Sequence, residues 1–198
     1  MLVDTSFQAG IFSMRSFVAI NLPEKLRVSL STTASGFAKI RPLRPVKPDN
    51  IHLTLKFLGE VNEASIESIK QALSSASRGH DGFSLNVRSI GAFPDLRRPS
   101  VIWAGLDESR ELLNLWSDIE KHLADIGFAP EPGGFSPHLT IGRVKDAKLS
   151  AGIADIILPL KDSFFGSIDV AVFSLMKSIL KPEGPVYSVL ADFYLKKD

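Results

Sequence analysis

Two short stretches of the chain pair a histidine with a threonine in the same pattern. Ile51-His52-Leu53-Thr54-Leu55 recurs later as Pro137-His138-Leu139-Thr140-Ile141. With four histidines and five threonines in 198 residues, composition alone gives about 0.1 His-x-Thr sequences, so two copies stand well above chance. Because successive side chains of a β-strand point to opposite faces, each His and Thr would share one face while apolar residues pack behind them. The two motifs therefore form a candidate active site.

Two histidines suit a reaction in which one group takes a proton while another gives one. Imidazole does either near pH 7, because its unperturbed pKa is about 6.5. Displacement at phosphorus has this demand, since the attacking and leaving oxygens lie roughly in line and the other oxygens need hydrogen-bond donors. Thr54 and Thr140 are hydroxyl donors beside the histidines, and Arg143 offers a charged, forked donor. This chemistry needs no metal or cofactor, and the residues alone leave open which histidine is the acid.

The composition bounds the class of protein. A chain of 198 residues with 44% hydrophobic content can bury a sizeable core and suits one domain or two small lobes. The net charge of +1 provides no global attraction to nucleic acid or to an anionic membrane. The absence of cysteine excludes disulfides, thiolate metal sites and cysteine nucleophiles, and it fits a reducing cytosol. No apolar run approaches the roughly 18 residues of a membrane span.

Regular hydrophobic patterning begins directly after Met14. The residues before it lack the basic start and apolar centre of a signal peptide, and Asp4 and Gln8 interrupt them. We therefore expect residues 1–13 to be an extension outside the fold, with Met14 as a candidate start of the protein.

Hydrophobic periodicity and turn residues predict an alternation of strands and helices. A loop at residues 41–50 contains three prolines, which we expect to exclude regular pairing. His80 lies in a turn and is expected at the surface, whereas His122 is expected in the last turn of a helix, where it interacts with the helix dipole. The expected strands are 17–22, 52–58, 83–88, 101–106, 138–144, 164–177 and 187–195, and the expected helices begin near Pro23 and Asn62, follow residue 106 up to Gly127, and cover 146–157.

The two halves of the chain share one order of elements: strand, helix, His-x-Thr strand, helix, strand. This order predicts duplicated β-α-β-α-β units of the α+β or α/β class, related by a pseudo-two-fold axis around a central cleft. We expect one two-lobed domain over residues 14–198, with a first half of about 14–92 and a second half of about 93–198. Equivalent surfaces meet at such an axis, so the two motif strands would face each other across the cleft.

The paired motifs resemble the signature of the 2H phosphoesterase superfamily, and within it that of the RNA 2′,3′-cyclic phosphodiesterases, historically called 2′-5′ RNA ligases. Similarity spans about residues 15–195 and includes Arg15-Ser16-Phe17-Val18-Ala19-Ile20 with Leu22-Pro23, Arg44-Pro45-Val46 through Phe57-Leu58-Gly59-Glu60-Val61, Phe135-Ser136-Pro137, and Gly184-Pro185-Val186-Tyr187. The resemblance implies the 2H phosphoesterase fold, with two lobes around a central cleft.

The resemblance also implies an activity and a role for each motif residue. The activity is hydrolysis of an RNA 2′,3′-cyclic phosphate to a 2′-phosphomonoester. The chemistry of the residues predicts that it needs no metal or cofactor, and the lack of cysteine agrees with the expected location in the cytoplasm. By position, His52 matches the general acid that protonates the departing 3′ oxygen, and His138 matches the general base that activates water. Thr54 and Thr140 match phosphate-binding hydroxyls, and Arg143 matches a basic residue after the second motif. RNA ends are the expected partners of a monomer that has no membrane attachment and no obligate protein partner.

Other functions remain open from the residues alone. The same site could join 2′-5′ RNA ends or open a small cyclic nucleotide phosphate. A metal-dependent hydrolase with His52 and His138 as ligands is disfavoured, because no carboxylate lies on the motif strands. Base stacking would fall to Phe57, Phe93 or Phe135. A non-catalytic module that binds RNA ends would use cations around the cleft, namely Arg41, Arg44, Arg97, Arg98 and Arg143.

Overall fold

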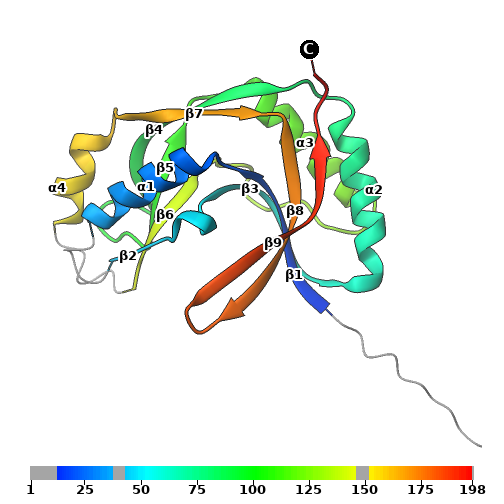
Figure 1. Ribbon diagram of the computed structural model, residues 1–198, viewed down its shortest axis with the longest axis horizontal. Coiled ribbons are helices and arrows are strands. Elements are labelled where there is room, and N and C mark those ends of the chain that lie inside the picture. Colours follow the sequence, from blue (N-terminus) through cyan, green and yellow to red (C-terminus); the bar gives the residue numbers. More distant parts are fainter. Residues whose placement is uncertain (1–12, 38–42, 146–151, 198) are drawn as a thin grey trace, which may run out of the picture.

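The computed structural model describes residues 13–37, 43–145 and 152–197. The described strands form one antiparallel sheet in the order β7-β4-β5-β6-β3-β1-β8-β9, with β2 paired to β6 (Figure 1). The strands are β1 (Ser13–Asn21), β2 (Leu43–Pro45), β3 (His52–Asn62), β4 (Phe83–Phe93), β5 (Val101–Leu106), β6 (Leu139–Val144), β7 (Phe164–Val170), β8 (Val172–Lys181) and β9 (Gly184–Tyr194). The helices are α1 (Glu24–Gly36), α2 (Ile66–Ser77), α3 (Arg110–Ala124) and α4 (Ile153–Ile157), with 3₁₀ turns at Pro48–Asn50, Glu63–Ser65 and Leu158–Leu160. Of the expected extension, residues 1–12 lie outside the described part and Ser13 begins β1.

The sheet has an approximate two-fold symmetry about its two central strands. Reading outward, β3 is followed by β1, β8 and β9, and β6 is followed by β5, β4 and β7. The expected order of elements is confirmed, because β1-α1-β3-α2-β4 is repeated as β5-α3-β6-α4-β7. The last strand of the first repeat, β4, pairs with β5 of the second. The strands of the two repeats therefore interleave in space, since β4 of the first repeat lies between β5 and β7 of the second.

The expectation of one strand over residues 164–177 is wrong. The chain bends at Ala171, so that β7 pairs with β4 in one group of strands and β8 pairs with β1 in the other. Apolar residues continue on both sides of the bend, and this is why the pattern does not reveal it. The strands β8 and β9 form a hairpin that projects away from the rest of the sheet (Figure 1).

The expectation for the proline-containing loop also needs correction. Residues 43–45 pair with β6 as a short strand, because a proline is tolerated at a sheet edge where its missing N–H is not required. Residues 38–42 lie outside the described part, as do residues 146–151 of the helix expected over 146–157, of which α4 is the described portion. Within the described residues, every helix is too short or too polar to cross a bilayer.

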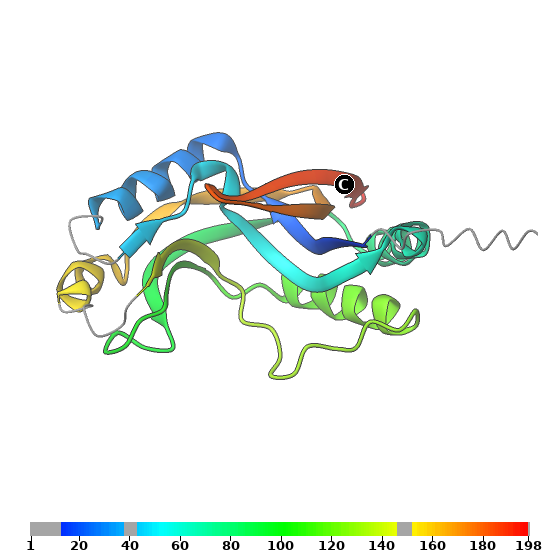
Figure 2. The same ribbon diagram turned by 90° about the horizontal axis from the view of Figure 1, so that it is seen from below.

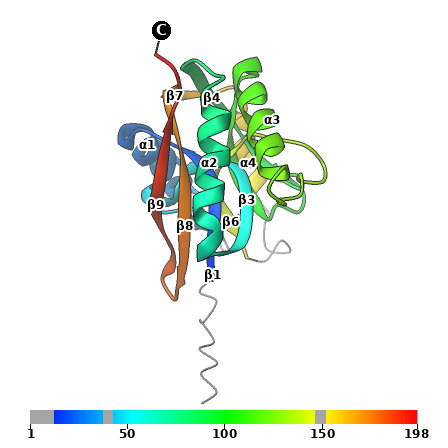
Figure 3. The same cartoon turned by 90° about the vertical axis from the view of Figure 1, so that its right-hand side faces the viewer.

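One main core lies between the sheet and the helices and holds the motif strands from behind. Leu53 and Leu139 are fully buried in it. The side chain of Ser109 caps α3 by accepting a hydrogen bond from the amide of Leu112 at 3.1 Å. The buried side of α3 consists mainly of leucines and an isoleucine at helical spacing: Leu112, Leu115, Ile119 and Leu123. Figure 3 shows α2 beside α3, with which it packs.

Candidate active site

The two motif strands are neighbours in the centre of the sheet. Leu53 of β3 pairs with Leu139 of β6 in antiparallel register, and both side chains point into the core. Because side chains alternate, the motif histidines and threonines project from the opposite face. Extending this register by one residue in each direction would set each histidine opposite the threonine of the other motif, with the two histidines as diagonal neighbours. The corners of this rectangle would be His52, Thr140, His138 and Thr54.

Both imidazoles are oriented by the same kind of backbone contact. Nδ1 of His52 lies 3.0 Å from the carbonyl oxygen of Asn50, and Nδ1 of His138 lies 2.8 Å from that of Ser136. A carbonyl can only accept, so Nδ1 carries the hydrogen in each neutral ring and Nε2 has the free lone pair. Each Nε2 can therefore accept a proton.

His52 is enclosed by aromatic rings that sequence reasoning did not identify as its neighbours. Its ring centroid lies 4.8 Å from that of Phe17 and 5.2 Å from that of Tyr187, which meets it edge-on at 87°. The side chain of Asn50 donates from Nδ2 to the carbonyl of Pro185 at 3.0 Å. Asn50 therefore both orients the imidazole and ties the β8–β9 hairpin beside it.

The electrostatics around His52 follow from this enclosure. Burial lowers the pKa of His52 from 6.5 to about 4, while the hydrogen bond to Asn50 opposes the shift and the charges of His138 and Arg143 add to it. Burial also raises the pKa of Tyr187, and the charge of Arg143 opposes that rise. Because Arg143 acts on both groups, its guanidinium lies within electrostatic range of the imidazole and of the tyrosine hydroxyl.

Among the described residues, His138 has fewer ring contacts than His52. Phe93 meets it edge-on with centroids 5.0 Å apart, and Trp103 packs against Phe93 at 5.3 Å. Trp103 in turn lies across Gly91 of β4, where a Cβ atom would stand only 2.2 Å from the indole ring. Glycine at this position lets the indole support the phenylalanine that contacts the second histidine.

A bulge in each motif strand brings one more side chain to the face of the site. Pairing with the neighbouring strand skips one residue directly after each threonine. The bulge buries two consecutive residues, Leu55 and Lys56 in one strand and Ile141 and Gly142 in the other. The following residues, Phe57 and Arg143, are exposed on the side of the histidines. Strict alternation would have placed both on the core face.

The other expected cations differ in their distance from the motifs. Arg44 is the β2 partner of Arg143 at the edge of β6. Arg97 and Arg98 are exposed in the β4–β5 loop, where one carboxylate oxygen of Asp95 accepts hydrogen bonds from both backbone amides. Arg41 lies outside the described residues. Arg143 is thus the cation that the bulge turns toward the histidines.

The remaining two histidines lie on the helix side of the molecule. The expectation of an unpartnered surface residue at His80 is wrong, because its side chain is only 12% exposed and Nε2 lies 2.8 Å from Oδ2 of Asp118 on α3. His122 lies in the last turn of α3, as expected, and its Nδ1 donates to the carbonyl of Asp118 at 2.8 Å. The contact of His80 joins the turn after α2 to α3, and the contact of His122 lies within α3. Both histidines therefore have structural partners.

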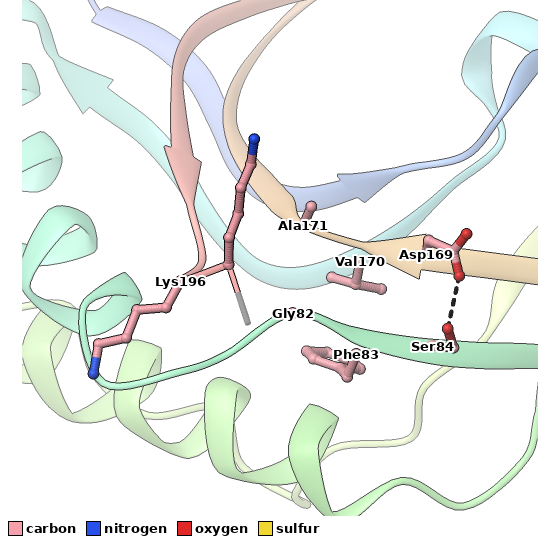
Figure 4. Close-up of a pocket in the computed structure, with 8 residues that line it drawn as sticks. Gly82, Phe83, Ser84, Asp169, Val170, Ala171 and Lys196 are labelled. Atoms are coloured by element: carbon pink, nitrogen blue, oxygen red, sulfur yellow. Dashed lines mark hydrogen bonds between the residues drawn. The ribbon is translucent and has the colours of Figure 1, made fainter.

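A separate hollow lies where β4, β7 and the C-terminal segment meet (Figure 4). Its volume is about 390 Å³, and residues 82–84, 169–171, 196 and 197 line it. Ser84 donates from Oγ to Asp169 at 2.7 Å within it. The motif residues take no part in this lining. Within the described ranges, no three His, Asp or Glu side chains are grouped so that they could hold a metal ion.

The sheet and the paired motifs define a class of protein. Two His-x-Thr motifs on neighbouring strands, at the centre of a duplicated sheet, are the arrangement expected of a 2H phosphoesterase. The LigT like Phosphoesterase family model matches residues 20–103 and again residues 105–187. The chain belongs to this family, and the expected fold is confirmed. The two matches correspond to the two repeats that carry the two motifs.

Known relatives and solved structures are similar over nearly the whole chain. An RNA 2′,3′-cyclic phosphodiesterase of Archaeoglobus fulgidus is 34% identical over 91% of this chain and 99% of its own length. Another of that name, from Thermotoga maritima, is 37% identical over 89% of this chain and 93% of its own length. The crystal structure of TT0787 of Thermus thermophilus matches with a TM-score of 0.79 and 30% identity, covering 93% of this chain and all of that one. Escherichia coli LigT complexed with 3′-AMP matches with a TM-score of 0.75 and 28% identity, covering 93% of this chain and 99% of that one.

Proposed function

We propose that this protein hydrolyses the 2′,3′-cyclic phosphate at the end of an RNA chain to a 2′-phosphomonoester, without a metal. The observation that carries the proposal is the pairing of Leu53 with Leu139, which makes the two motif strands neighbours, together with the orientation of each imidazole through Nδ1. The name RNA 2′,3′-cyclic phosphodiesterase, borne by the relatives, supports this substrate. Two imidazoles on a diagonal suit a phosphorus atom held between them, with the attacking and leaving oxygens on opposite sides.

In the proposed reaction each histidine moves one proton. His138 takes a proton at Nε2 from a water molecule whose oxygen attacks phosphorus. The bond from phosphorus to the 3′ oxygen breaks, and protonated His52 gives its proton to that oxygen. The threonines donate hydrogen bonds to the non-bridging oxygens, and Arg143 adds a positive charge beside them. The product carries its phosphate on the 2′ oxygen, and proton exchange with solvent restores both rings.

The acid role needs a proton that His52 does not hold in the free protein at pH 7. Its pKa of about 4 reflects burial in the absence of an anion. A phosphate diester carries a negative charge, and an opposite charge close to an imidazole raises its pKa. We therefore infer that His52 takes up its proton together with the substrate.

An aromatic side chain beside the site supports a nucleotide as the substrate. Of the three expected stacking candidates, Phe135 is stacked on Trp116 and Phe93 contacts His138, whereas Phe57 is 63% exposed. A base attached to the bound ribose could stack on Phe57. We propose RNA ends as the partners of a monomeric enzyme that acts in the cytoplasm with no obligate protein partner.

Product analysis tests the proposal directly. An RNA oligonucleotide with a 2′,3′-cyclic phosphate end is incubated with the protein in the presence of a chelator, and the products are followed by ³¹P NMR. The expected product is the 2′-phosphomonoester. A 3′-phosphomonoester, or activity that requires a divalent ion, would contradict the proposal. A 5′-hydroxyl RNA and a cyclic nucleotide, each added in parallel, distinguish ligation and small-molecule hydrolysis from the proposed reaction.

A further inference from the structure

A buried ion pair lies on the side of β3 that faces away from the histidines. Nζ of Lys56 lies 2.8 Å from each carboxylate oxygen of Glu120 on α3. The two side chains are only 2% and 8% exposed. The bulge of β3 turns Lys56 into the interior, where it meets the helix. The proposed reaction makes no use of this pair, although buried charges need several partners to be tolerated.

The partners of this pair belong to the loop that leads to the second motif. Lys56 Nζ also donates to the carbonyl of Ala129 at 2.9 Å, and Glu120 accepts from the amide of Glu131 at 3.3 Å. The side chain of Glu131 reaches back and accepts a hydrogen bond from the amide of Phe57 at 3.2 Å. The loop is therefore bound to two consecutive residues of β3, Lys56 and Phe57. It is also bound to Glu120 of α3.

The same face of α3 contacts the loop again just before the histidine. Trp116 lies four residues before Glu120 and thus on the same side of the helix. Its ring stacks on Phe135 with centroids 5.1 Å apart and an interplanar angle of 5°. The next residue, Ser136, provides the carbonyl that orients His138. Figure 2 shows this segment as a long loop that runs from the end of α3 back to β6.

The sheet itself connects the two motif strands weakly. β3 and β6 are paired at a single pair of residues, Leu53 and Leu139, whereas β1 and β3 are paired along most of their length. The separation of the two histidines therefore depends on contacts outside this ladder. The network around Lys56 supplies such contacts, because it joins the strand of His52 to the loop of His138.

We propose that Lys56 and Glu120 are positioning residues that hold His138 at its working distance from His52. This inference rests on the proposed function. An apolar pair of similar volume would stabilise the fold as well as an ion pair does, but it could not bind the carbonyl of Ala129 or the amide of Glu131. The charged side chains therefore contribute what an apolar pair could not, namely hydrogen bonds that hold the loop in place.

The variant Lys56→Met/Glu120→Leu separates positioning from stability. Each single substitution strands a buried charge and should lower the melting temperature by about 10 °C, whereas the double variant should return close to the wild-type value. In the double variant kcat should remain about 100-fold below that of the wild type, because the loop is released and small misplacements of a catalytic group are costly. KM should change by less than about threefold, since the phosphate-binding residues are intact. Recovery of kcat together with stability would overturn the proposal.

Glu131→Ala provides a second test that does not disturb the interior. Glu131 is exposed, so its loss should leave the melting temperature unchanged while it frees the loop from the amide of Phe57. A kcat about tenfold below wild type is expected. Glu108→Ala, which removes another exposed glutamate two residues before α3, is the matched control with unchanged kcat. Equal kcat in both variants would contradict the proposal.

Amide hydrogen exchange separates this inference from the proposed function. The amides of Phe57 and Glu131 should exchange faster in the double variant than in the wild type, whatever the substrate. Unchanged exchange at both amides would show that Lys56 and Glu120 do not hold the loop in place, and would overturn the proposal. A wild-type protein that leaves cyclic phosphate ends intact would instead overturn the proposed function and leave the exchange result standing.

Discussion

The surroundings of the two motif histidines differ although their backbone geometry is the same. Each imidazole donates from Nδ1 to the carbonyl two residues before it. His52 lies between Phe17 and Tyr187, and Asn50 ties a hairpin against it. His138 follows an irregular loop and contacts Phe93. The duplicated scaffold therefore sets the orientation of both rings, whereas burial in the first repeat lowers the pKa of His52.

A second difference appears five residues after each histidine. The bulges in β3 and β6 turn Phe57 and Arg143 outward at equivalent positions. One repeat thus presents an aromatic ring on the face of the histidines, and the other presents a cation. We infer that the first repeat receives the base of a nucleotide and the second receives the charge of its phosphate.

The largest expected effect comes from removing either histidine. His52→Ala and His138→Ala should each lower kcat by about 10²- to 10⁴-fold, because each removes one of two coupled proton transfers. The double variant should be about as slow as the slower single variant, since the two groups act as a unit. Single-turnover rates on an RNA cyclic phosphate measure this, with His122→Ala as the control. A single variant that keeps more than about a tenth of wild-type activity would show that the two repeats do not share the chemistry.

A smaller effect is expected at the cation of the second repeat. Arg143→Gln should lower kcat/KM by about 30-fold, because a hydrogen bond between charged groups contributes about 2 kcal/mol. The dependence of KM on salt concentration should also be weaker in this variant, because one positive charge at the site is lost. Arg97→Gln, which removes an exposed arginine of the β4–β5 loop, is the matched control. An equal loss in both variants would favour diffuse attraction of RNA by the surface cations over a defined phosphate contact.

The aromatic residue of the first repeat should affect binding alone. Phe57→Ala should raise KM for RNA ends and cyclic nucleotides by about tenfold, since stacking of one base contributes about 1–3 kcal/mol. The kcat should not change. Glycerol 1,2-cyclic phosphate has no base and should be turned over equally well by both forms. Phe164→Ala removes another exposed phenylalanine and serves as the control. A KM effect on the baseless substrate would contradict a stacking role.

The motif residues and the order of elements are predictable from sequence because they depend on local patterns. Alternation of polar and apolar residues places His52 and Thr54 on one face, and the repeat of that pattern pairs them with His138 and Thr140. The bulges are not predictable in this way, because they arise from pairing with a neighbouring strand. Strict alternation would have turned Arg143 into the core, although its charge and its place after the second motif made it a candidate for the site.

Contacts between distant parts of the chain are also not predictable from sequence patterns. Asn50 and Pro185 are 135 positions apart, and Lys56 and Glu120 are 64 positions apart. A lysine within an apolar strand carries no sign that its partner lies on a helix. The bend at Ala171, which separates β7 from β8, has the same origin, since tertiary pairing decides it. What sequence patterns leave out is therefore the packing that makes the two repeats unequal.

The smallest expected effect concerns the pKa of His52, which can be measured without any catalysis and tests whether the packing of the first repeat differs from that of the second. NMR titration of the imidazole C–H resonances should give His52 a midpoint near pH 4 in the free protein, because burial disfavours the charged ring. Its resonance is identified by its absence in His52→Ala. Inorganic phosphate bound in the cleft should move the midpoint upward, since an anion favours the charged ring. A midpoint near 6.5 without phosphate would show that the enclosure does not control the proton.

Tyr187→Ala and Tyr187→Phe locate the source of that control. Alanine opens one side of the enclosure to water, so the pKa of His52 should rise from about 4 toward 6.5. Phenylalanine keeps the ring edge-on to the imidazole and should leave the midpoint in place. A shift caused by phenylalanine as well would assign the effect to the hydroxyl, and would mean that the first repeat differs from the second by a hydrogen-bonding group rather than by burial.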